Sequence, residues 1–556
     1  MTTGEERYWS HIPRYSDVPT TKFINWDWQV FSIVDTKKLS RLLEEVLPEK
    51  LGVSRTLPHI QTKQDFIHEV EMGLKEAPMS IRLTPHVISR INWQNPVDDP
   101  LRRQFIPIKS GLVPDHPQLT FDSLNEQEDC AVDGLIHRYP GKALFLPISV
   151  CPVYCRFCTR SWAVGGNTDL INKESQRPIL RRWEKVFQHI EHDPSIEDIV
   201  VSGGDSYQLL PDQLRIIGER LLSIPHIRRF RIASKGIAVA PGRILDKADR
   251  WVDEIIALSN RGREMGKQVC IHTHFNHPNE ITWITRKAAA YLFSRGVIVR
   301  NQSVLLKGVN DDLETMSRLI KSLADLNVEP YYVYQCDLVR GVEDLRTPLR
   351  TILELEKRIR GTLTGFMMPS FVVDLPGGGG KRLASTHEKY DEINGVSFWR
   401  APGLPGQKGK QIYTYYDPFP KTKVIHERQR KLVKATLAQM NEQLRLPGTD
   451  VVEDNKHSAA ETVGYALNKY QEGTKMSQAL AMNEKLGSIQ SRGGDAIENG
   501  LKFTPTKSSQ EMPGETIANK NGIPAKSQED QSVETNCTIP IEREEEPQKR
   551  VASAGN

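Results

Sequence analysis

The chain has 556 residues, more than one compact domain usually holds, so two or three structural units are expected. Its formal net charge of +4 is nearly neutral for this length and gives no support for nucleic-acid or membrane binding. Seven cysteines, an odd number, argue against a disulfide-bonded secreted scaffold and for a reducing compartment. Because the sequence also lacks an 18-residue apolar run and an apolar leader, we expect a cytoplasmic protein without a membrane span.

Residues 1–137 are predicted to form a helical N-terminal region. Within it, residues 35–52 (DTKKLSRLLEEVLPEKLG) and 62–77 (TKQDFIHEVEMGLKEA) alternate polar and apolar side chains at the spacing of amphipathic helices.

Residues 138–383 are predicted to form an α/β core. From about Ala143 the sequence pattern changes, and helical stretches begin to alternate with six β-rich runs: ALFLPIS, DIVVSGG, RFRIASK, QVCIHTHF, VIVRNQSVLL and YYVYQCD. Such alternation is typical of parallel βαβ units, and six units fit a partial (β/α)6 barrel better than a flat doubly wound sheet. Functional groups are then expected at the carboxyl ends of the strands.

The C-terminal part is predicted to comprise two segments. Residues 384–430 read as a C-terminal segment of the same body, and residues 431–556 as a helical segment followed by a tail. From about Gln471 the tail is polar and has one aromatic residue, so it buries too little apolar surface to offset its ordering entropy. We therefore expect that tail to be disordered.

Cys151, Cys155 and Cys158 form a C-x3-C-x2-C run in SVCPVYCRFCTR. Three thiolates can hold three irons of a [4Fe–4S] cluster and leave the fourth iron free to chelate a small molecule such as S-adenosylmethionine (SAM). A closed zinc site would need a fourth cysteine or histidine at matched spacing, and the sequence has no second C-x-x-C pair. The alternative is that these are three unrelated thiols in a loop.

The run Ser202-Gly203-Gly204-Asp205 follows the second β-rich run. Glycines there allow a backbone to approach a ligand closely, and the carboxylate suits a cationic amino group such as that of SAM. An ordinary Gly-Gly turn is the alternative.

Lys381 ends the run PGGGGK, which departs from a phosphate-binding P-loop because Leu375 takes the place of its first glycine and Arg382 that of Ser/Thr. After a flexible glycine hinge, this lysine is a candidate to bind the aldehyde of pyridoxal 5′-phosphate (PLP). By composition alone, a solvated lysine after a flexible loop is the more common case.

The histidines of HTHFNHPNE suggest a different chemistry. His272 and His274 point to one face of a strand, and with His277 and either Asp337 or Asp374 they form a candidate metal site of a hydrolase. Alternatively, the two aspartates suit a substrate ammonium group, and Arg160 suits a carboxylate. Ordinary surface charge is the simplest reading of each.

Taken in order, these motifs resemble the lysine 2,3-aminomutase family. The resemblance covers about residues 24–420 and is carried by NWDWQV, HRYPGK, CPVYCRFCTR, VSGGD, THFNHPNEIT, NQSVLLKGVND, PYYVYQCDL, RTP and FVVDLPGGGGK. It implies a radical SAM partial barrel with PLP as second cofactor. The implied activity moves the amino group of L-lysine from the α- to the β-carbon and gives β-lysine.

The resemblance also implies a role for each matching residue. Cys151, Cys155 and Cys158 would bind the cluster. SAM contacts would come from Ser202, Gly203, Gly204, Asp205, His274 and Gln302. Lys381 would be the catalytic PLP lysine, and Arg138 would contact the PLP phosphate. Arg160 would pair with the substrate carboxylate, and Asp337 and Asp374 would hold its side-chain ammonium. A flavodoxin- or ferredoxin-like electron donor and a homo-oligomer are further expectations.

Four departures from the family pattern bear on substrate and metal content. Ser161-Trp162 replaces further arginines, SKGIAVAPGRI replaces SRTPVVLPQRI, and two loops are longer, near residues 173–182 and 260–267. Asp312 stands where the clostridial type has a zinc thiol, so structural zinc of that type is not expected. Two alternatives stay open: a radical SAM enzyme acting on arginine or protein-bound lysine, and a metal-dependent hydrolase.

Overall fold

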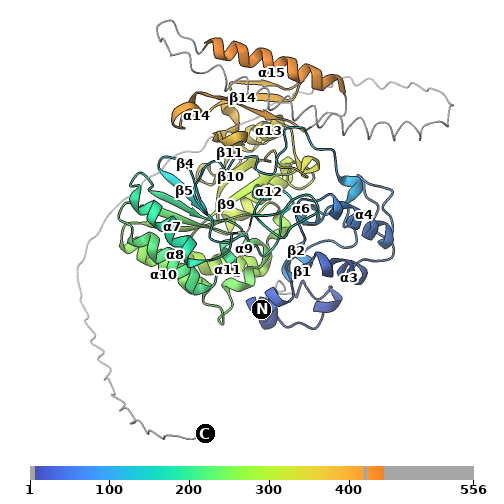
Figure 1. Cartoon of the computed structure of the whole chain (residues 1–556). Helices are drawn as coiled ribbons and strands as arrows, with labels where there is room; N and C mark the ends of the chain where they lie inside the picture. The colour runs from blue at the N-terminus through green and yellow to red at the C-terminus, as the bar shows by residue number, and fades with distance from the viewer. Residues whose placement is uncertain (1–6, 175, 419–422, 444–556) are drawn as a thin grey trace, which may run out of the picture. The chain divides into compact units, whose positions relative to one another are not determined.

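The computed structural model describes residues 7–174, 176–418 and 423–443, all within one compact unit that comprises Met1–Lys485. The predicted tail lies outside the described residues, as does the part of segment 431–556 that follows residue 443. The element order of the described part is shown in Figure 1.

A ten-stranded sheet forms the core (Figure 1). In spatial order it runs β12-β11-β10-β9-β8-β7-β6-β5-β4-β3, and β5 through β11 pair in parallel, whereas β3, β4 and β12 pair antiparallel at the two ends. The strands are β3 (Cys130–Val132), β4 (Leu135–Tyr139), β5 (Lys142–Phe145), β6 (Asp198–Val201), β7 (Arg229–Ala233), β8 (Gln268–Thr273), β9 (Ile298–Leu305), β10 (Glu329–Gln335), β11 (Ser370–Leu375) and β12 (Gly380–Leu383).

A helix follows each of the first six parallel strands, which confirms the α/β class and the six predicted β/α units. These helices are α7 (Leu180–His192), α8 (Pro211–Ser223), α10 (Trp251–Glu264), α11 (Trp283–Ser294), α12 (Leu313–Asp325) and α13 (Leu349–Ile359). A short helix, α9 (Gly236–Val239), precedes α10. The seventh parallel strand, β11, was not predicted.

The sheet curls so that its two ends meet. The backbone N–H of Lys381 on β12 donates to the hydroxyl of Tyr139 on β4, over 3.0 Å. In strand order these two strands stand eight places apart, so a flat sheet would hold them far from each other. The contact therefore favours the partial barrel over the flat doubly wound alternative.

Side-chain patterns explain which faces are buried. Along β9 burial alternates strictly, so Val299 and Leu305 lie on the buried face while Arg300 and Gln302 lie on the other. On α8 the absence of a side chain at Gly218 brings the helix against α10, because a Cβ there would lie 2.3 Å from a methyl carbon of Leu258.

The N-terminal region is mainly helical and docks on the core. Its helices are α1 (Thr20–Ile24), α2 (Trp26–Phe31), α3 (Thr36–Val46), α4 (Lys63–Lys75), α5 (Pro85–Ile88) and α6 (Pro100–Phe105), and β1 (Val34–Asp35) pairs with β2 (Arg82–Leu83). The carboxylate of Asp246 accepts the backbone N–H of Trp26 at 2.7 Å, and the Arg243 guanidinium lies 4.5 Å from that indole ring. The core sheet begins at Cys130, inside the segment predicted to belong to this region.

A second, three-stranded antiparallel sheet follows the core. Its strands are β13 (Lys389–Asp391), β14 (Val396–Arg400) and β15 (Ile412–Tyr416), with α14 (Gly406–Lys410) between the last two. Helix α15 (Lys423–Gln443) covers one face, where Met440 packs with Val396 and Phe398. The hydroxyl of Tyr415 donates to the carbonyl of Cys336 at 2.7 Å, so this small sheet supports the end of β10.

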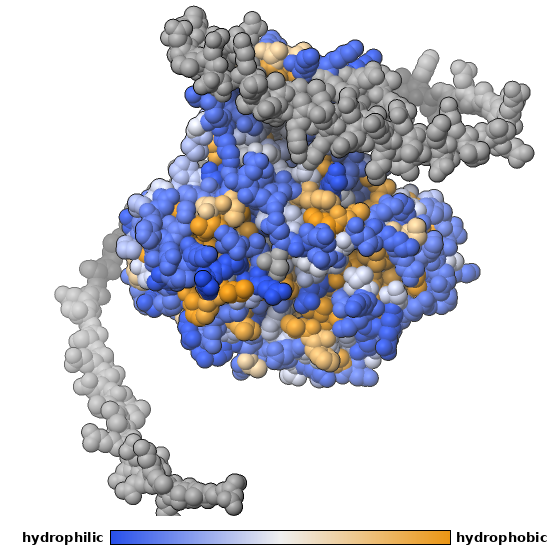
Figure 2. All heavy atoms as spheres, viewed as in Figure 1, coloured by the Kyte–Doolittle hydropathy of each residue, from blue (hydrophilic) through white to orange (hydrophobic). Residues whose placement is uncertain are grey.

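Among the described helices, none has the length and apolarity that a bilayer crossing requires. In Figure 2 hydrophilic residues cover most of the visible face, and the apolar patches between them are small.

Arg346 provides a test of how the small sheet is fastened to the core. Its fully buried guanidinium donates to Glu343 Oε2 at 2.6 Å and to the carbonyl of Tyr416. Arg346→Ala leaves a buried carboxylate without its cation, so the free energy of unfolding measured by urea denaturation should fall by about 3–5 kcal/mol.

The matched control is Arg350→Ala on α13. Its ion pair with Glu392 also links α13 to the small-sheet segment, but both side chains are more than half exposed, so a loss below about 1 kcal/mol is expected. Equal losses in the two variants would contradict the assigned role of Arg346.

Candidate cofactor and substrate site

The three clustered cysteines lie in the loop after β5, at the carboxyl edge of the parallel sheet. All three are free thiols and half-buried. Burial raises the pKa of Cys155 to about 12 and that of Cys158 above its ordinary value. For Cys151, burial and then the charges of Asp205 and of the other two thiols raise the pKa further. Such mutually interacting, desolvated thiols ionise together only when a metal centre binds them.

The donor set of this loop suits an iron–sulfur cluster. Three thiolates are soft ligands of the kind that hold iron in such clusters. Among the described residues, no histidine or carboxylate joins them in a group whose ligand atoms all lie within 4.8 Å of one another. The chemistry of the three donors therefore fits a [4Fe–4S] cluster.

His274 lies directly against this cysteine loop. Its ring stacks on Phe157, between the second and third cysteines, with centroids 5.7 Å apart and planes inclined by 18°. Its Nε2 atom is buried and has no hydrogen-bond partner. An unpartnered buried nitrogen beside the loop is what a contact to a bound molecule requires.

The Ser202–Asp205 turn packs on the segment that leads into the cysteine loop. Gly203 has φ +85°, and a Cβ there would lie 2.2 Å from the carbonyl oxygen of Ile148. The N–H of Gly204 donates to the same oxygen at 2.5 Å, and that of Asp205 donates to Val150 at 3.0 Å. The glycines are thus required for packing of chain against chain, in addition to any approach to a ligand.

Asp205 is engaged within the protein itself. One carboxylate oxygen accepts the N–H of Tyr207 and the other that of Lys235, each at 2.8 Å, and burial raises its pKa. The carboxylate therefore holds the turn to the end of β7. A cationic amino group placed here would share oxygens that already accept hydrogen bonds, which weakens the expected direct SAM contact.

The histidines of HTHFNHPNE do not form the predicted hydrolase metal site, and Gln302, a predicted SAM contact, bonds one of them. Gln302 Nε2 lies 3.2 Å from His272 Nδ1, and Gln302 Oε1 accepts the hydroxyl of Tyr334 at 2.8 Å. His277 Nδ1 instead accepts the N–H of Asn279. The three rings thus serve different partners, and they are not grouped with a carboxylate within 4.8 Å in the described part of the chain. The hydrolase alternative was wrong on this point.

Arg160 lies beside the third cluster cysteine and contacts two polar groups. Its Nη2 donates to Glu126 Oε1 at 2.9 Å, and its Nη1 lies 3.4 Å from Ser202 Oγ. Burial alone would lower the pKa of Arg160, but the Glu126 carboxylate holds it above its ordinary value. The second oxygen of Glu126 has no partner, so a carboxylate already stands where the substrate carboxylate was predicted.

Lys381 forms an ion pair with Asp374. The two residues face each other in the antiparallel register of β11 and β12, and Nζ lies 2.7 Å from Asp374 Oδ2. Burial alone would lower the pKa of Lys381, yet the Asp374 charge holds it above its ordinary value. Its side chain is 38% exposed, so it is neither freely solvated nor sealed inside the core.

Asp337, just after β10, completes this acidic end of the site. Burial and then the charge of Asp374 raise the pKa of Asp337 well above its ordinary value. Asp337 Oδ1 and Asp374 Oδ1 are both buried without hydrogen-bond partners. Two orphaned carboxylate oxygens, one of them on the partner of an ammonium group, make this end of the site suited to a cation.

The glycines of the PGGGGK turn have a packing role. Gly377, Gly378 and Gly380 have positive φ, and a Cβ at Gly380 would lie 2.0 Å from the Tyr139 hydroxyl oxygen. Only Gly377 of these has open space around it. The flexible hinge before Lys381 stays a prediction, and the close approach at Gly380 is an additional reason for glycine there.

Arg138 lies next to the same turn. A Cβ at Gly378 would be 3.7 Å from Arg138 Nε, which donates to Asp129 Oδ2 at 2.6 Å. Lys408 pairs with the other oxygen of Asp129. A guanidinium and an ammonium thus meet at the Asp129 carboxylate, and the guanidinium is the cation that lies next to the positive-φ Gly378. A guanidinium beside a glycine turn fits an anionic group such as a phosphate.

Three further charged residues lie at the site and were not predicted from the sequence. They are Glu126, which pairs with Arg160, and the buried ion pair of Lys235 with Glu280 at 2.7 Å. Lys235 also donates to the carbonyl of His274 at 2.8 Å. The one available signal was that Lys235 falls in SKGIAVAPGRI, where the sequence departs from the family pattern.

The departure at Ser161 and Trp162 has a packing explanation. Both residues are buried, and Trp162 packs with Ile136 and Leu146 in a small apolar cluster. Two side chains that would be charged in the family pattern are thus part of the core here.

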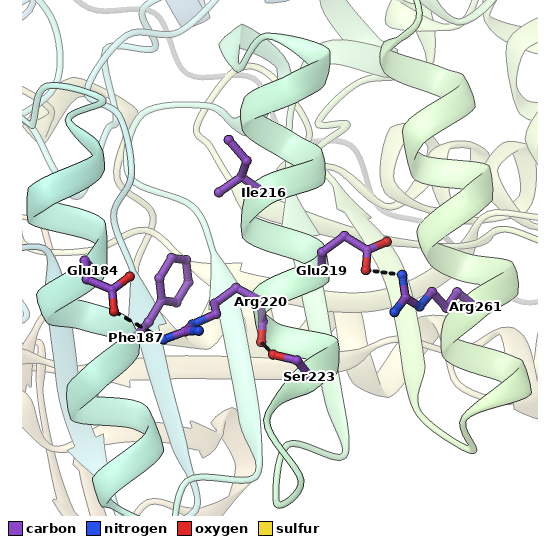
Figure 3. A pocket seen from close by; sticks show the side chains of 7 residues that line it. All are labelled: Glu184, Phe187, Ile216, Glu219, Arg220, Ser223 and Arg261. Carbon is purple, nitrogen blue, oxygen red and sulfur yellow. Dashed lines mark hydrogen bonds and ion pairs between the residues drawn. The ribbon is translucent and has the colours of Figure 1, made fainter.

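A surface groove lies away from these strand ends, on the outer helices α7, α8 and α10 (Figure 3). Figure 3 shows Arg220 beside Glu184 and Arg261 beside Glu219, and both are ion pairs. With its charges already paired and no catalytic group in its lining, the groove is not a second candidate site.

Comparison with known proteins gives a consistent set of relatives. An L-lysine 2,3-aminomutase of Acetoanaerobium sticklandii is 34% identical over 370 residues, which cover 66% of this chain and 80% of that protein. An L-lysine 2,3-aminomutase of Clostridium subterminale is 35% identical over 384 residues, covering 67% and 83%. A glutamate 2,3-aminomutase of Clostridioides difficile is 28% identical over 358 residues, covering 64% and 75%.

No protein-family model matches the chain. Among solved structures, a radical SAM methyltransferase from Sphaerobacter thermophilus covers 43% of this chain at 16% identity with a TM-score of 0.29, a likeness too partial to weigh in the argument.

Gly204 tests the contact between the Ser202–Asp205 turn and the cysteine loop. In Gly204→Ala the methyl group would lie 2.6 Å from the backbone N and O of Val150, so the loop must shift. We expect the free energy of unfolding to fall by about 1–3 kcal/mol and the iron content after anaerobic reconstitution to fall with it.

The control is Gly166→Ala, where the nearest atom, Ser80 Oγ, would lie 3.8 Å from the new methyl group. That variant should keep wild-type stability and iron content. Full iron binding in Gly204→Ala would show that the turn does not position the cluster loop.

Proposed function

The chain belongs to the lysine 2,3-aminomutase family, and we propose that it is a radical SAM, PLP-dependent 2,3-aminomutase that converts L-lysine to β-lysine. Aminomutases are intramolecular transferases, enzymes that move an amino group within one molecule. The observation that carries the proposal for lysine is the ion pair of Lys381 with Asp374, which places an ammonium group at the acidic end of the site.

Each cofactor has a set of residues that fits it. When bound, a [4Fe–4S] cluster with SAM supplies a carbon radical that removes hydrogen from an unreactive C–H bond, and PLP supplies an aldehyde that carries the migrating amino group. Cys151, Cys155 and Cys158 would hold three irons, and His274 with its orphaned Nε2 would face the molecule on the fourth.

Lys381 and Arg138 would hold PLP beside the PGGGGK turn. Arg138 uses Nε and Nη2 in its bonds to Asp129 and to the carbonyl of Leu124, and its Nη1 takes no part in these bonds. Beside the Gly378 backbone, this guanidinium is available to a phosphate. Lys381 would hold the aldehyde of PLP through Nζ, the atom that now pairs with Asp374.

Departure of Lys381 would make room for the substrate. Asp374 and Asp337 would then hold the side-chain ammonium of lysine in the place where Lys381 Nζ now stands. Arg160, between Ser202 and Glu126, would pair with the substrate carboxylate and release Glu126. Two anchors at opposite ends fix the carbon chain between them, so the β-carbon is held for hydrogen removal and water is excluded.

Other cationic substrates stay within the proposal, whereas glutamate does not fit it. A 28% identical relative is named for glutamate, but a carboxylate beside Asp337 and Asp374 would meet like charges in a desolvated site, a cost on the order of several kcal/mol. Arginine or protein-bound lysine would keep a cation at this end. A flavodoxin- or ferredoxin-like electron donor and a homo-oligomeric state stay predictions.

The substrate prediction is tested by anaerobic turnover with SAM, PLP, dithionite and a panel of amino acids, read by mass spectrometry. We expect L-lysine to be the best substrate, L-arginine a weaker one and L-glutamate little or not converted. Asp374→Asn should lower kcat/KM for L-lysine about 10- to 100-fold, because a hydrogen bond between charged groups is lost.

Asp325→Asn, in an exposed ion pair on α12, should leave turnover unchanged and serves as the control. If glutamate is the better substrate of the wild type, the roles assigned to Asp337 and Asp374 are wrong even if the enzyme class is right.

The PLP prediction is tested by borohydride reduction of PLP-loaded protein and peptide mapping. We expect PLP to be fixed on Lys381, and Lys381→Ala to lose both the covalent label and turnover. Lys321→Ala, on the exposed face of α12, should keep both. A label on Lys408 or Lys142 in the wild type would transfer the role to that lysine.

A further inference from the structure

Two histidines and an aspartate gather where β4 meets the end of α7, apart from the cysteine loop. His137 lies on β4, His189 in the last turn of α7, and Asp193 is the residue that ends this helix. One ligand atom of each lies within 4.8 Å of the other two, and in the described residues this is the one such group of three found. None of the three has a role in the proposed reaction.

Hydrogen bonds orient the side chains of His137 and Asp193 so that each has an atom available to a metal ion. His137 Nε2 lies 3.4 Å from the carbonyl oxygen of Pro140, a contact that places the ring proton on Nε2 and leaves Nδ1 as the free lone pair. That Nδ1 atom faces Asp193 Oδ2 at 3.8 Å. The other oxygen of Asp193 accepts the backbone N–H and the hydroxyl of Ser195, at 3.0 and 2.6 Å.

His189 gives the strongest indication that this cluster binds a ligand. Its Nε2 atom is buried and has no hydrogen-bond partner. The rings of His137 and His189 meet edge to face with centroids 5.9 Å apart, a geometry that does not join them by a hydrogen bond. A buried, unpartnered nitrogen is costly unless it binds something, and both neighbours here are potential ligands too.

The electrostatic setting favours a cation. The three side chains lie at the C-terminal end of α7, where the helix dipole is negative, and Asp193 adds a full charge. Hydrogen bonds from Ser195 lower the pKa of Asp193, so it stays a carboxylate at neutral pH. Side chains of His137 and Asp193 are 16% and 34% exposed, which leaves a path to solvent.

We propose that His137, His189 and Asp193 bind one divalent transition metal ion, with zinc as the best match. Two imidazole nitrogens and one carboxylate oxygen are a common zinc donor set, and water completes the tetrahedron. Ser195 and the Pro140 carbonyl orient the ligands from behind, as outer partners do in metal sites. The ion would fasten β4 to α7, one residue before Arg138.

The experiment uses the full chain with its iron–sulfur cluster reconstituted anaerobically, so that the cysteine loop is occupied. One equivalent of zinc is added, free metal is removed, and metal content is measured together with the zinc K-edge absorption fine structure. We expect one zinc per chain with only nitrogen and oxygen ligands at about 2.0–2.1 Å.

Variants then assign the ligands. His189→Asn and Asp193→Asn should lose stoichiometric zinc, and Ser195→Ala should bind it about tenfold more weakly. His192→Asn, an exposed histidine on the same helix, should bind like the wild type. Added zinc should raise the Tm of the wild type and of His192→Asn but not that of the two ligand variants.

Three results would overturn the proposal: sulfur ligands near about 2.3 Å, which would place the zinc at cysteines; no retained zinc in the wild type; or full retention in Asp193→Asn and His189→Asn. None of these readouts depends on turnover, so the zinc site and the proposed aminomutase activity can fail independently.

Discussion

Parallel pairing of β5 through β11 is the constraint on which the site depends. Because parallel strands all end at one edge, the loops after β5, β6, β8 and β10 open at the same place. The antiparallel return of β12 then brings Lys381 back beside Asp374, and the bond from Lys381 to Tyr139 joins the two ends of the curled sheet. A cysteine loop, an acidic pair and a lysine thus meet although they are far apart in the chain.

The two glycine-rich motifs show how backbone packing and ligand chemistry share the same residues. Gly203 and Gly204 leave the room that Ile148 and Val150 need, so the turn and the cysteine loop form one unit. In PGGGGK, Gly380 leaves room for Tyr139. Both motifs first position the chain, and only through that position do they shape a cofactor site.

Much of the fold was predictable from the sequence because its signals are local. Six β-rich runs alternate with amphipathic helices, and each corresponds to an observed parallel strand. Strand β11 was missed because its run ends directly in proline and glycines, which are typical of loops. The small sheet, β13 to β15, was missed because its strands lie between polar and glycine-rich stretches without a clear period.

Site residues that belong to a sequence motif were predictable. Site residues that meet only through contacts between distant segments were not. The cysteines, Lys381 and the two aspartates stand in recognisable runs. Glu126 pairs with Arg160 across 34 positions, and Lys235 with Glu280 across 45, so neither pair leaves a periodic signal. His137, His189 and Asp193 meet for the same reason, through the packing of α7 on β4.

The central claim is that three thiolates hold a cluster whose fourth iron is open to SAM at the edge of this sheet. Mössbauer spectroscopy of the 57Fe-reconstituted full chain, with and without SAM, tests it most directly. One iron of the four should change its isomer shift and quadrupole splitting when SAM is added, while the other three should not. Four equivalent irons that are unaffected by SAM would contradict it.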